Sequence, residues 1–423
     1  MVTPTKTPVL YSAGDGVTFE LVEHKGKIGF VLYDSKSGSC SFAEQSGSTL
    51  PKQNVPWLLA GMPIEYGNDY QLYQEVREFI YNHVELPEET EYDIMTTWVL
   101  AAYRFKEFQS FPYICAIGPP ASGKTRLIKT LYQLSYRGIF GAALTVSAMF
   151  RAIHRDSVSI YLDQSEHLSN SKEAPDFLAI VDNGYQKGGK KFLTNTDTGD
   201  YESYNVYSPK AFASTKTLEE TLESRSIRVS MQARTREISI KIDERRATIL
   251  RSKLLLYKFR HSEETEQTEE NEQILTKLTK NGRLIELFLP LYTVTVSSSF
   301  PSDASAPSTK LLEYLKSKNQ SRQAEEQASI DAEIVRALAD CEGIIVGGKL
   351  SYNEIALMFN AQKLPGEQWK VKTVAKKVRD LGFTSCRLSN GSSAIYWNAA
   401  LLKKHKKRFM IEEQTTTIEV APA

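Results

Sequence analysis

The segment that most constrains the fold of this chain is an eight-residue loop motif, Gly118-Pro119-Pro120-Ala121-Ser122-Gly123-Lys124-Thr125. It fits the pattern G-x-x-x-x-G-K-[ST], with the β-rich run FPYICAI before it and the helical period TRLIKTLYQLSY after it. Glycines in such a loop let backbone N–H groups close around phosphate groups, and the following helix adds the positive end of its dipole. The motif therefore predicts a phosphate-binding loop between a strand and a helix.

Two side chains of the motif and one later carboxylate have separate predicted roles. We expect Lys124 to reach the β- and γ-phosphates of a nucleoside triphosphate, and the Thr125 hydroxyl to bind Mg²⁺. The buried strand SVSIYLD ends at Asp163, where an acid can hold the Mg²⁺ shell. A chance match in a surface loop is the alternative, and the flanking strand and helix argue against it. ATP and Mg²⁺ are therefore the predicted ligands.

The residues after Asp163 leave the rate of hydrolysis open. ATPases of this type usually carry Glu next, to polarise the attacking water, and this chain carries Gln164. A carboxamide accepts no proton but can orient a water molecule. Glu166 returns to the side of Asp163 if the chain turns helically, and it can then serve as the base. Active hydrolysis, slow switch-like hydrolysis and nucleotide binding alone all remain open.

Three further positions are candidates for sensing the nucleotide. The strand at 210–215 ends in Ser214 and Thr215, whose hydroxyls can touch the γ-phosphate or only cap the strand. Arg225 lies at a helix end just before a strand, where ring ATPases place the arginine that stabilises transition-state charge in a neighbouring subunit. A helix-terminal arginine is also often a partner of the helix dipole. Arg283 is a candidate lid-borne sensor on spacing alone.

Alternating apolar runs and helical periods from Phe111 to Met231 predict a parallel sheet with helices on both faces. A β-hairpin, VTFELVEHKGKIGFVLY, comes before it, and the turn-rich stretch after that hairpin predicts no element. The expected regions are a β-rich element (1–69), a nucleotide-binding core (70–235), a helical lid with a flexible Ser/Pro-rich linker (236–328), a winged-helix domain (329–410) and a flexible tail (411–423).

The segments GPPASGKT, YLDQSEHL, KAFAST and LESRSI, in this order, resemble an AAA+ ATPase module. With MFRAIH, VDNGYQKGGKKF and a terminal winged helix, the chain is similar over about residues 90–410 to ATPases of plasmids, phages and integrated mobile elements. Those are grouped near minichromosome-maintenance and superfamily III replicative helicases. The resemblance implies a P-loop AAA+ three-layer αβα fold and a homo-oligomeric ring, expected to be a hexamer, with ATP between subunits. It departs at Gln164, and the first 60 residues match nothing we can name.

The same resemblance suggests a role for the segment KGGKKFLTNTDTGDYESYNVYSPK. Inserted hairpins at this point line the central channel of the helicases that the chain resembles. Lys187, Lys190 and Lys191 would then face nucleic-acid phosphate. A plain surface hairpin with a basic rim is the alternative.

Basic residues gather in the last domain. Between Asp331 and Met410 there are fourteen Lys or Arg and seven Asp or Glu, whereas the whole chain has a net charge of +1. Apolar residues of the third helix (Val371, Val374, Val378 and Leu381) can pack inward. The predicted DNA contacts are on this helix and on the following wing: Lys370, Lys372, Lys376, Lys377, Arg379 and Arg387. A protein-contact module is the alternative.

Composition excludes other classes of protein. Lys and Arg number 52 against 51 Asp and Glu, so the chain is not a uniformly basic coat for nucleic acid. Its four cysteines form no CxxC pair, so the sequence indicates neither a zinc site nor a disulfide framework, and free thiols are expected. The sequence has no apolar stretch of about 18 residues and no signal-peptide run. We expect a cytoplasmic protein with no membrane partner.

Together these features predict an ATP hydrolase that binds single- or double-stranded DNA, a motor of the replicative helicase type from a mobile element or virus. The alternative is a nucleotide-gated DNA-binding adaptor that binds or slowly hydrolyses ATP without unwinding, which Gln164 favours. A metabolic P-loop kinase fits poorly, because the sequence shows no acceptor site and because it predicts a winged helix.

Overall fold

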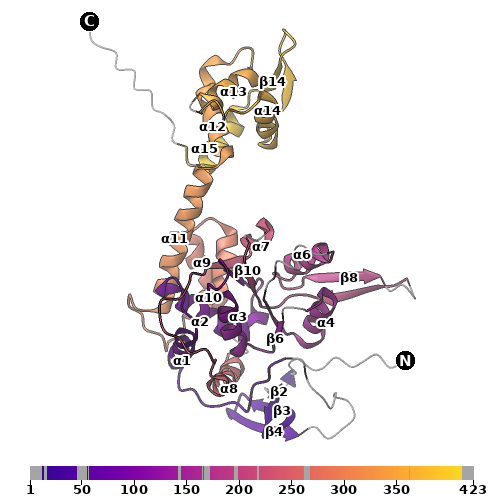
Figure 1. Ribbon diagram of the computed structural model, residues 1–423, viewed down its shortest axis with the longest axis vertical. Coiled ribbons are helices and arrows are strands. Elements are labelled where there is room, and N and C mark those ends of the chain that lie inside the picture. Colours follow the sequence, from indigo (N-terminus) through magenta and orange to yellow (C-terminus); the bar gives the residue numbers. More distant parts are fainter. Residues whose placement is uncertain are drawn as a thin grey trace. The chain divides into compact units, whose positions relative to one another are not determined.

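The 423-residue chain is described from a computed structural model. The description covers residues 12–13, 17–44, 55, 57–141, 144–163, 165, 172–194, 199–216, 219–261, 267–361 and 363–411. Contacts divide the chain into two units, Met1–Lys316 and Ser317–Ala423, each with its own core. Figure 1 shows the order of the elements along the chain, and each unit is described separately below.

A five-stranded parallel sheet forms the centre of the first unit. Its strand order is β11, β5, β10, β7, β6, with bounds Ser226–Ser230, Tyr113–Ile117, Lys210–Ser214, Ser159–Leu162 and Gly138–Gly141. All residues of β5, β7 and β10 are buried, as expected for parallel strands covered on both faces. These strands were predicted from short, mostly apolar runs bounded by turns, and the predicted α/β parallel sheet is confirmed.

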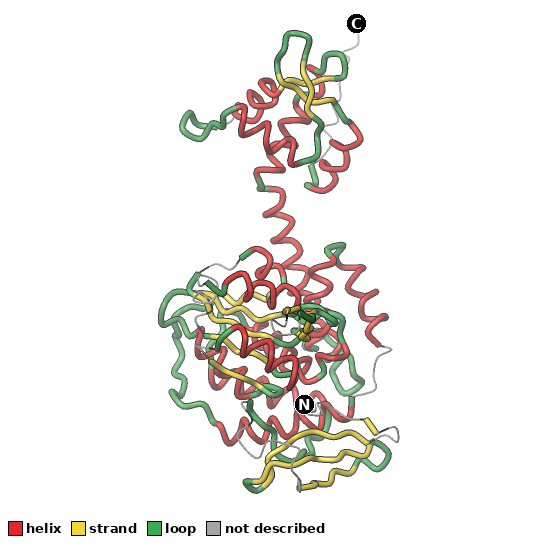
Figure 2. Tube along the Cα trace, turned by 90° about the vertical axis from the view of Figure 1, so that its right-hand side faces the viewer, coloured by secondary structure: helices red, strands yellow, loops and turns green. Residues whose placement is uncertain are grey.

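Helices cover this sheet (Figure 2). Helix α3 (Lys124–Gln133) follows β5 and contacts β5, β7 and β10. Helices α4 (Val146–Asp156), α6 (Ala174–Asn183) and α7 (Glu220–Ser224) lie between later strands of the chain. Trp98 of α2 (Glu89–Tyr103) packs on Tyr161 of β7, and its indole N–H donates to the Pro112 carbonyl.

The N-terminal element is a four-stranded antiparallel sheet, β1 to β4 in sequence order (Figure 2). Its strands are Ser12–Ala13, Val17–His24, Lys27–Asp34 and Ser39–Glu44. The predicted hairpin is β2–β3, which turns at Lys25-Gly26, both with positive φ. Strand β4 was not predicted, because its run SCSFAE lies in a stretch rich in Ser and Gly and becomes a strand by pairing with β3. Tyr33 stacks on Phe259 at 5.1 Å, so the sheet shares the core of the first unit.

Helices complete the first unit. They are α1 (Asp69–His83), the 3₁₀ turn η1 (Phe105–Glu107), α8 (Glu244–Arg260), α9 (Gln267–Leu278), α10 (Gly282–Thr293) and the first part of α11 (Pro307–Gln327). Helix α1 begins with a capping box formed by Asn68 and Gln71.

The Ser/Pro-rich segment before α11 differs from the flexible linker expected there. Phe300 is 7% exposed and packs edge-on against Tyr70 and Tyr73, and Ala306 is fully buried. The Ser- and Pro-rich composition of the segment did not reveal this packing, because a single residue, Phe300, makes the aromatic contacts. The contact boundary falls inside α11, between Lys316 and Ser317, and not at residue 329.

The second unit contains the three helices and the hairpin expected from the sequence. Helices α12 (Ile330–Asp340), α13 (Tyr352–Asn360) and α14 (Val371–Asp380) precede β13 (Ser385–Arg387) and β14 (Ser393–Tyr396). Three elements were not predicted: the 3₁₀ turn η2 (Glu342–Ile344), strand β12 (Lys349–Ser351), which pairs with β14, and helix α15 (Ala399–Arg408). The resulting sheet has the order β12, β14, β13 and is antiparallel.

Candidate nucleotide site and basic surfaces

The motif forms the loop between β5 and α3. Gly118 leaves no room for a side chain, because a Cβ there would lie 2.4 Å from the Met231 carbonyl oxygen. Gly123 has a φ of 89°, a left-handed conformation that favours glycine, and it caps α3 without a side-chain hydrogen bond. The first N–H groups of a helix have no intrahelical partners, so those of α3 face the loop. A helix N-terminus of this kind favours a nearby anion.

Lys124 lies within the curve of this loop. Its Nζ donates to the carbonyl oxygens of Gly118 at 2.8 Å and Pro119 at 2.6 Å, and it lies 3.5 Å from the Ser122 hydroxyl. The residue is only 8% exposed. A positive charge is thus held beside the N-terminus of α3, where both the charge and the helix dipole favour an anion.

Thr125 and Asp163 meet, although 38 residues separate them in the sequence. The Thr125 hydroxyl donates to Asp163 Oδ1 at 2.9 Å, at the carboxyl end of β7. Among the described residues, no cluster of three or more His, Cys, Asp or Glu is arranged to hold a metal ion. Mg²⁺ needs no such cluster, because it is commonly held by one or two protein oxygens together with substrate phosphates and water. Gln164 and Glu166 lie outside the described residues.

Strand β10 lies between β5 and β7, so its carboxyl end is between the loop and Asp163. Ser214 is in register with Ile117, the residue before the loop. Its hydroxyl donates to the Lys216 carbonyl at 2.9 Å and accepts from the Lys216 N–H at 3.1 Å. These bonds fit the strand-capping alternative for Ser214. Thr215 is exposed at the same strand end.

A pocket of about 290 Å³ opens beside the loop. Its walls come from the end of α1, from the loop and from the segment after β11, with His83, Val84, Ser122, Gly123, Ile238 and Ile240 among the lining residues. Arg126 of α3 joins these walls, since its guanidinium donates to the carbonyls of His83, Ser239 and Ile240, each at 2.6 Å. The pocket is therefore partly apolar, and the Arg126 side chain links its walls by hydrogen bonds to three backbone carbonyls.

Two further contacts fix the pocket wall. Glu85 accepts from the N–H groups of Thr235 and Arg236, at 2.9 and 2.8 Å, and the guanidinium of Arg236 lies 3.8 Å from the Tyr81 ring centroid. The hydrogen bond from the Thr235 hydroxyl at 2.7 Å, with that from the Arg236 N–H, lowers the pKa of Glu85. Sequence reasoning missed this wall, because its members are scattered single residues without a motif.

His83 joins α1 to the start of α8. Its Nδ1 lies 2.7 Å from the Phe79 carbonyl and its Nε2 lies 3.1 Å from the Asp243 N–H, so the neutral ring donates at Nδ1 and accepts at Nε2. Burial lowers the pKa of His83, which favours this neutral form.

Arg225 and Arg283 lie away from the loop of their own chain. Arg225 precedes β11, and its carbonyl accepts from the N–H of Tyr113, the first residue of β5, whereas the loop follows the last residue of β5. The first and last residues of β5 are about 13 Å apart at the usual strand rise. Arg283 pairs with Glu286 at 2.5 Å and lies over the Tyr185 ring. The structure therefore does not bring either arginine to the loop beside Lys124.

The inserted segment forms a hairpin of β8 (Lys190–Thr194) and β9 (Tyr201–Asn205). Lys187 and Lys190 are exposed, as expected for contacts with a phosphate backbone. Lys191 is not: it is 9% exposed and its Nζ lies 2.6 Å from Asp176 Oδ1 of α6. The expectation for Lys191 is wrong, because alternate strand residues point to opposite faces and its face packs on helices.

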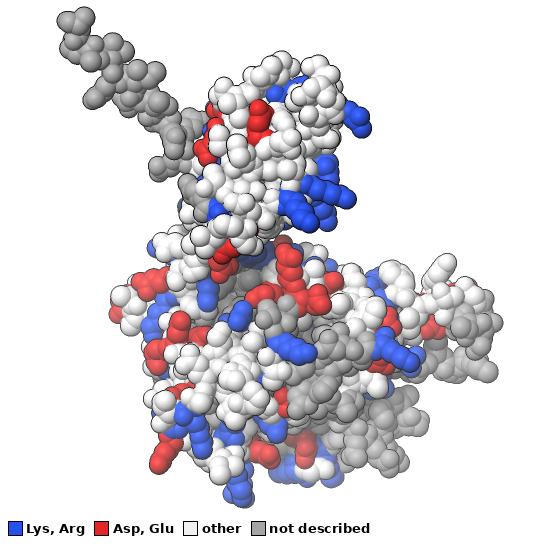
Figure 3. Space-filling model, turned by 45° about the horizontal axis from the view of Figure 1, so that its top comes forward, with Lys and Arg blue, Asp and Glu red and all other residues white. Residues whose placement is uncertain are grey.

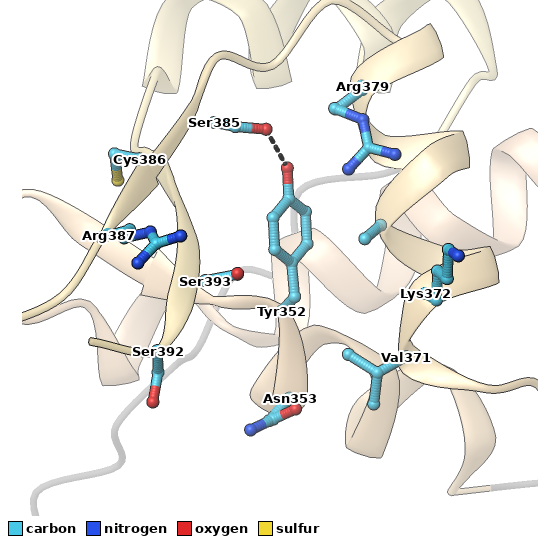
Figure 4. A pocket seen from close by; sticks show the side chains of 11 residues that line it. Tyr352, Asn353, Val371, Lys372, Arg379, Ser385, Cys386, Arg387, Ser392 and Ser393 are labelled. Atoms are coloured by element: carbon cyan, nitrogen blue, oxygen red, sulfur yellow. Dashed lines mark hydrogen bonds between the residues drawn. The ribbon is translucent and has the colours of Figure 1, made fainter. Parts of the chain in front are cut away.

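On the face seen in Figure 3, a group of Lys and Arg side chains lies together on the right-hand side of the second unit. A groove of about 720 Å³ runs between α14 and the β13–β14 hairpin, with Arg379 and Lys372 on the helix side and Arg387 on the strand side (Figure 4). Its floor includes Tyr352, whose hydroxyl lies 2.7 Å from Ser385 Oγ, and Asn353 at the start of α13. Positive side chains thus line both edges of a polar groove.

Two residues of α14 differ from their predicted places. Lys377 Nζ lies 3.0 Å from Asp331 Oδ1 of α12, so this lysine faces a neighbouring helix. Val371 was expected in the apolar face but is 38% exposed and lines the groove. The exposed basic residues of the helix region are Lys370, Lys372, Lys376 and Arg379.

Comparisons with known proteins give no assignment. No protein-family model and no curated protein matches the chain. An apo structure of the NrS-1 C-terminal region aligns over 90% of this chain and 96% of its own, with 11% identity and a TM-score of 0.34. A full-length MCM homolog from Methanopyrus kandleri aligns over 73% of this chain and 75% of its own, with 11% identity and a TM-score of 0.38. Both TM-scores are below 0.5, so neither similarity supports an argument about function.

The described helices include none with the length and hydropathy that a membrane span requires.

Proposed function

We propose that this chain is an ATP-dependent DNA-binding motor of the replicative helicase type, from a mobile element or virus. The observation that carries the proposal is the hydrogen bond between Thr125 and Asp163 at 2.9 Å, beside Lys124 and the N-terminus of α3. A hydroxyl and a carboxylate in contact at the carboxyl ends of a parallel sheet, next to a phosphate-type loop, are the parts of a Mg²⁺–triphosphate site.

Each group of the site has a part in binding ATP. The loop N–H groups and Lys124 would hold the phosphates, and Thr125 with Asp163 would hold Mg²⁺, which supplies charge neutralisation at the phosphate oxygens. The pocket beside Gly123, with Val84, Ile238 and Ile240 in its walls, suits a flat apolar base. Gly118 and Gly123 support this fit, because a side chain at either position would obstruct or strain the loop.

The position of Arg225 supports assembly into a ring, for which we propose a hexamer. At the opposite end of β5 from its own loop, Arg225 is too far to touch a nucleotide held by its own chain, but it can face a neighbouring subunit. Arg225 Nη1 lies 3.4 Å from Asp182 Oδ1 and donates to the Thr221 carbonyl at 2.7 Å, which holds the side chain in place. Arg283 is a second candidate for that interface.

The second unit supports the DNA-binding half of the proposal. Its helices and antiparallel sheet suit a winged helix, in which α14 would lie against DNA and the β13–β14 hairpin would be the wing. Arg379 and Arg387 on the two edges of the groove suit contacts with backbone phosphates. Lys377 is left out of this surface, because Asp331 pairs with it.

A nucleotide-gated adaptor is the second candidate, and Gln164 favours it. Without a carboxylate next to Asp163, water activation falls to Glu166 or to an orienting amide, and turnover slows. Such a protein would switch its DNA contacts with ATP and recruit a partner without unwinding.

ATP hydrolysis and strand displacement, measured with and without single-stranded DNA, separate the two candidates. A motor hydrolyses ATP faster with DNA and displaces a strand, and Lys124→Ala abolishes both activities. DNA-stimulated hydrolysis without displacement supports the adaptor. Gln164→Glu should then raise turnover, and Glu166→Ala should abolish it if Glu166 is the base. Hydrolysis that DNA leaves unchanged, with no displacement, contradicts the proposal.

A further inference from the structure

The segment between β11 and α8 crosses the pocket beside the loop. Residues 232–242, which we call the strap, form neither helix nor strand. The strap residues that line the pocket are Gln232, Arg234, Ile238, Ser239 and Ile240. Ile240 is 86% exposed, so apolar packing of this side chain does little to hold the strap. The position of the strap therefore depends mainly on hydrogen bonds from neighbouring elements.

The end of α1 and the residues after it hold the strap along one side. The carboxylate of Glu85 accepts from the N–H groups of Thr235 and Arg236, at 2.9 and 2.8 Å. His83 Nε2 accepts from the N–H of Asp243, the residue that follows the strap, at 3.1 Å. These contacts attach the strap to α1, but they leave its distance from the phosphate loop unset.

Arg126 attaches the strap to α3. It is the residue after Thr125, in the first turn of the helix that begins at the phosphate loop. Its guanidinium places a separate nitrogen on each of three carbonyl oxygens. Nε donates to His83, Nη1 to Ile240 and Nη2 to Ser239, each at 2.6 Å. The strap and the end of α1 are thereby tied to the helix that carries the loop lysine and threonine.

The shape of the guanidinium makes this tie rigid. Its three nitrogens lie in one plane at fixed distances from one another, so carbonyl groups bound to separate nitrogens are held apart at fixed positions. Lysine carries all its donors on one nitrogen at the end of a flexible stem, so carbonyl groups around it must converge on one point. A lysine at position 126 would therefore keep the positive charge and lose the spacing.

This spacing matters for a ligand that reaches from the loop into the pocket. A nucleoside triphosphate with its phosphates at the loop and its base in the pocket binds at both ends only when the two are the right distance apart. A bare polyphosphate uses the loop alone, so the position of the strap does not affect it. Holding the two parts of the site in place before binding lowers the cost of ordering them when the nucleotide arrives.

We propose that Arg126 is a positioning residue that fixes the strap and the end of α1 against the phosphate loop, so that the preference for a nucleoside triphosphate over a bare polyphosphate depends on it. The inference rests on the proposed binding of ATP and deepens it. Arg126 acts through the backbone carbonyls of the pocket wall and needs no contact with the nucleotide. Its guanidinium geometry, and not its charge alone, carries the effect.

The test compares two ligands by isothermal titration of the full-length chain with Mg²⁺ present: ATP, and inorganic tripolyphosphate, which has the phosphates without the nucleoside. Wild type should bind ATP more tightly. Arg126→Lys should weaken ATP binding roughly 5- to 30-fold and leave tripolyphosphate binding within about twofold of wild type. Arg246→Lys is the matched control, because Arg246 of α8 pairs with Glu78 of α1 at 2.5 Å and does not line the pocket. It should bind both ligands as wild type does.

Two further measurements separate positioning from general support of the fold. In steady-state hydrolysis, Arg126→Lys should raise KM for ATP by a factor similar to its loss of affinity and change kcat less than about twofold, because the lost interaction is equal in the ground and transition states. Glu85→Ala releases the strap at its other attachment and should also lower the preference for ATP over tripolyphosphate. Circular dichroism of each variant checks that it is folded.

Four results would overturn the inference. If Arg126→Lys weakens the binding of both ligands equally, the residue supports the loop or the fold as a whole. If it weakens neither, the charge suffices or the tie is unimportant. If wild type binds ATP no more tightly than tripolyphosphate, the pocket takes no base, although the phosphate site itself survives. If wild type binds neither ligand, the proposed function fails as well.

Discussion

Glu20 of β2 has three buried partners that join the N-terminal sheet to the rest of the first unit. Its carboxylate accepts from Arg137 Nε at 2.9 Å, from Lys258 Nζ at 2.8 Å and from the Tyr136 hydroxyl at 2.8 Å. Burial alone would raise the pKa of Glu20, but Arg137 and Lys258 outweigh it and lower the pKa to about 2. One anion thus compensates two buried cations.

Replacing this anion should be costly. Glu20→Gln removes the carboxylate that is hydrogen-bonded to both Arg137 and Lys258 in a buried site, and we expect a loss of about 3–5 kcal/mol in the free energy of unfolding. Urea denaturation measures this loss, and Glu23→Gln, an exposed carboxylate on the same strand, is the control. A loss no larger than that of the control would contradict the role given to Glu20.

The same contact predicts a pH dependence. Because the pKa of Glu20 is lower in the folded chain than its ordinary value of 4.5, its stabilisation is complete above pH 4.5 and is lost as the pH falls toward 2. The difference in stability between wild type and Glu20→Gln should therefore be constant from pH 7 to about 4.5 and shrink below that. A difference that is unchanged at pH 3 would contradict the lowered pKa.

At the scale of single residues, the sequence predicted those positions whose role follows from the neighbouring residues in the chain. Lys124 and Thr125 follow from the motif itself, and Asp163 follows from the end of an apolar run. The partners of Lys191 and Lys377 could not be predicted in this way. Asp176 and Asp331 lie on other elements of the fold, and no local sequence pattern indicates an ion pair between separate elements. Charge alone therefore does not show which of the predicted nucleic-acid contacts already have partners within the chain.

Helix α14 offers a matched test of the basic surface of the second unit at the scale of an element. Lys376 is exposed, and adjacent Lys377 pairs with Asp331 at 3.0 Å. Lys376→Ala should weaken DNA binding several-fold and lower the slope of log K against log salt by about 1, because one phosphate contact is lost. Lys377→Ala should leave that slope unchanged. Equal slopes for both variants, measured by fluorescence anisotropy at several salt concentrations, would contradict the assigned surface.

Elements with a continuous apolar run or a clear helical period were predictable, and elements made by distant pairing were not. Strands β5, β7 and β10 are fully buried, and their short, mostly apolar runs predicted them. Strand β12 has three residues and exists through its pairing with β14, more than 40 residues later. Phe300 shows the same limit, since only Tyr70 and Tyr73 turn a linker-like segment into part of the core.

At the scale of the whole molecule, the position of Arg225 predicts catalysis shared between chains. Arg225→Ala should keep ATP binding and lose most hydrolysis, because only charge stabilisation from the neighbouring subunit is removed. Mixing Arg225→Ala with Lys124→Ala should restore part of the activity, since some interfaces then combine an intact loop with an intact arginine. A mixture no more active than its components, in a steady-state ATPase assay, would contradict a shared site.

Binding of ATP at the 118–125 loop is the central claim, and isothermal titration with Mg²⁺ tests it most directly. Wild type should bind about one ATP per chain, and Lys124→Ala should bind roughly 10- to 100-fold more weakly, because a charge-assisted contact to phosphate is lost. Asp163→Asn should bind ATP without the gain that Mg²⁺ gives wild type. Lys129→Ala, exposed on the same helix, should bind as wild type does. Folded wild-type protein that gives no binding heat, or Lys124→Ala that binds as tightly as wild type, would contradict the claim.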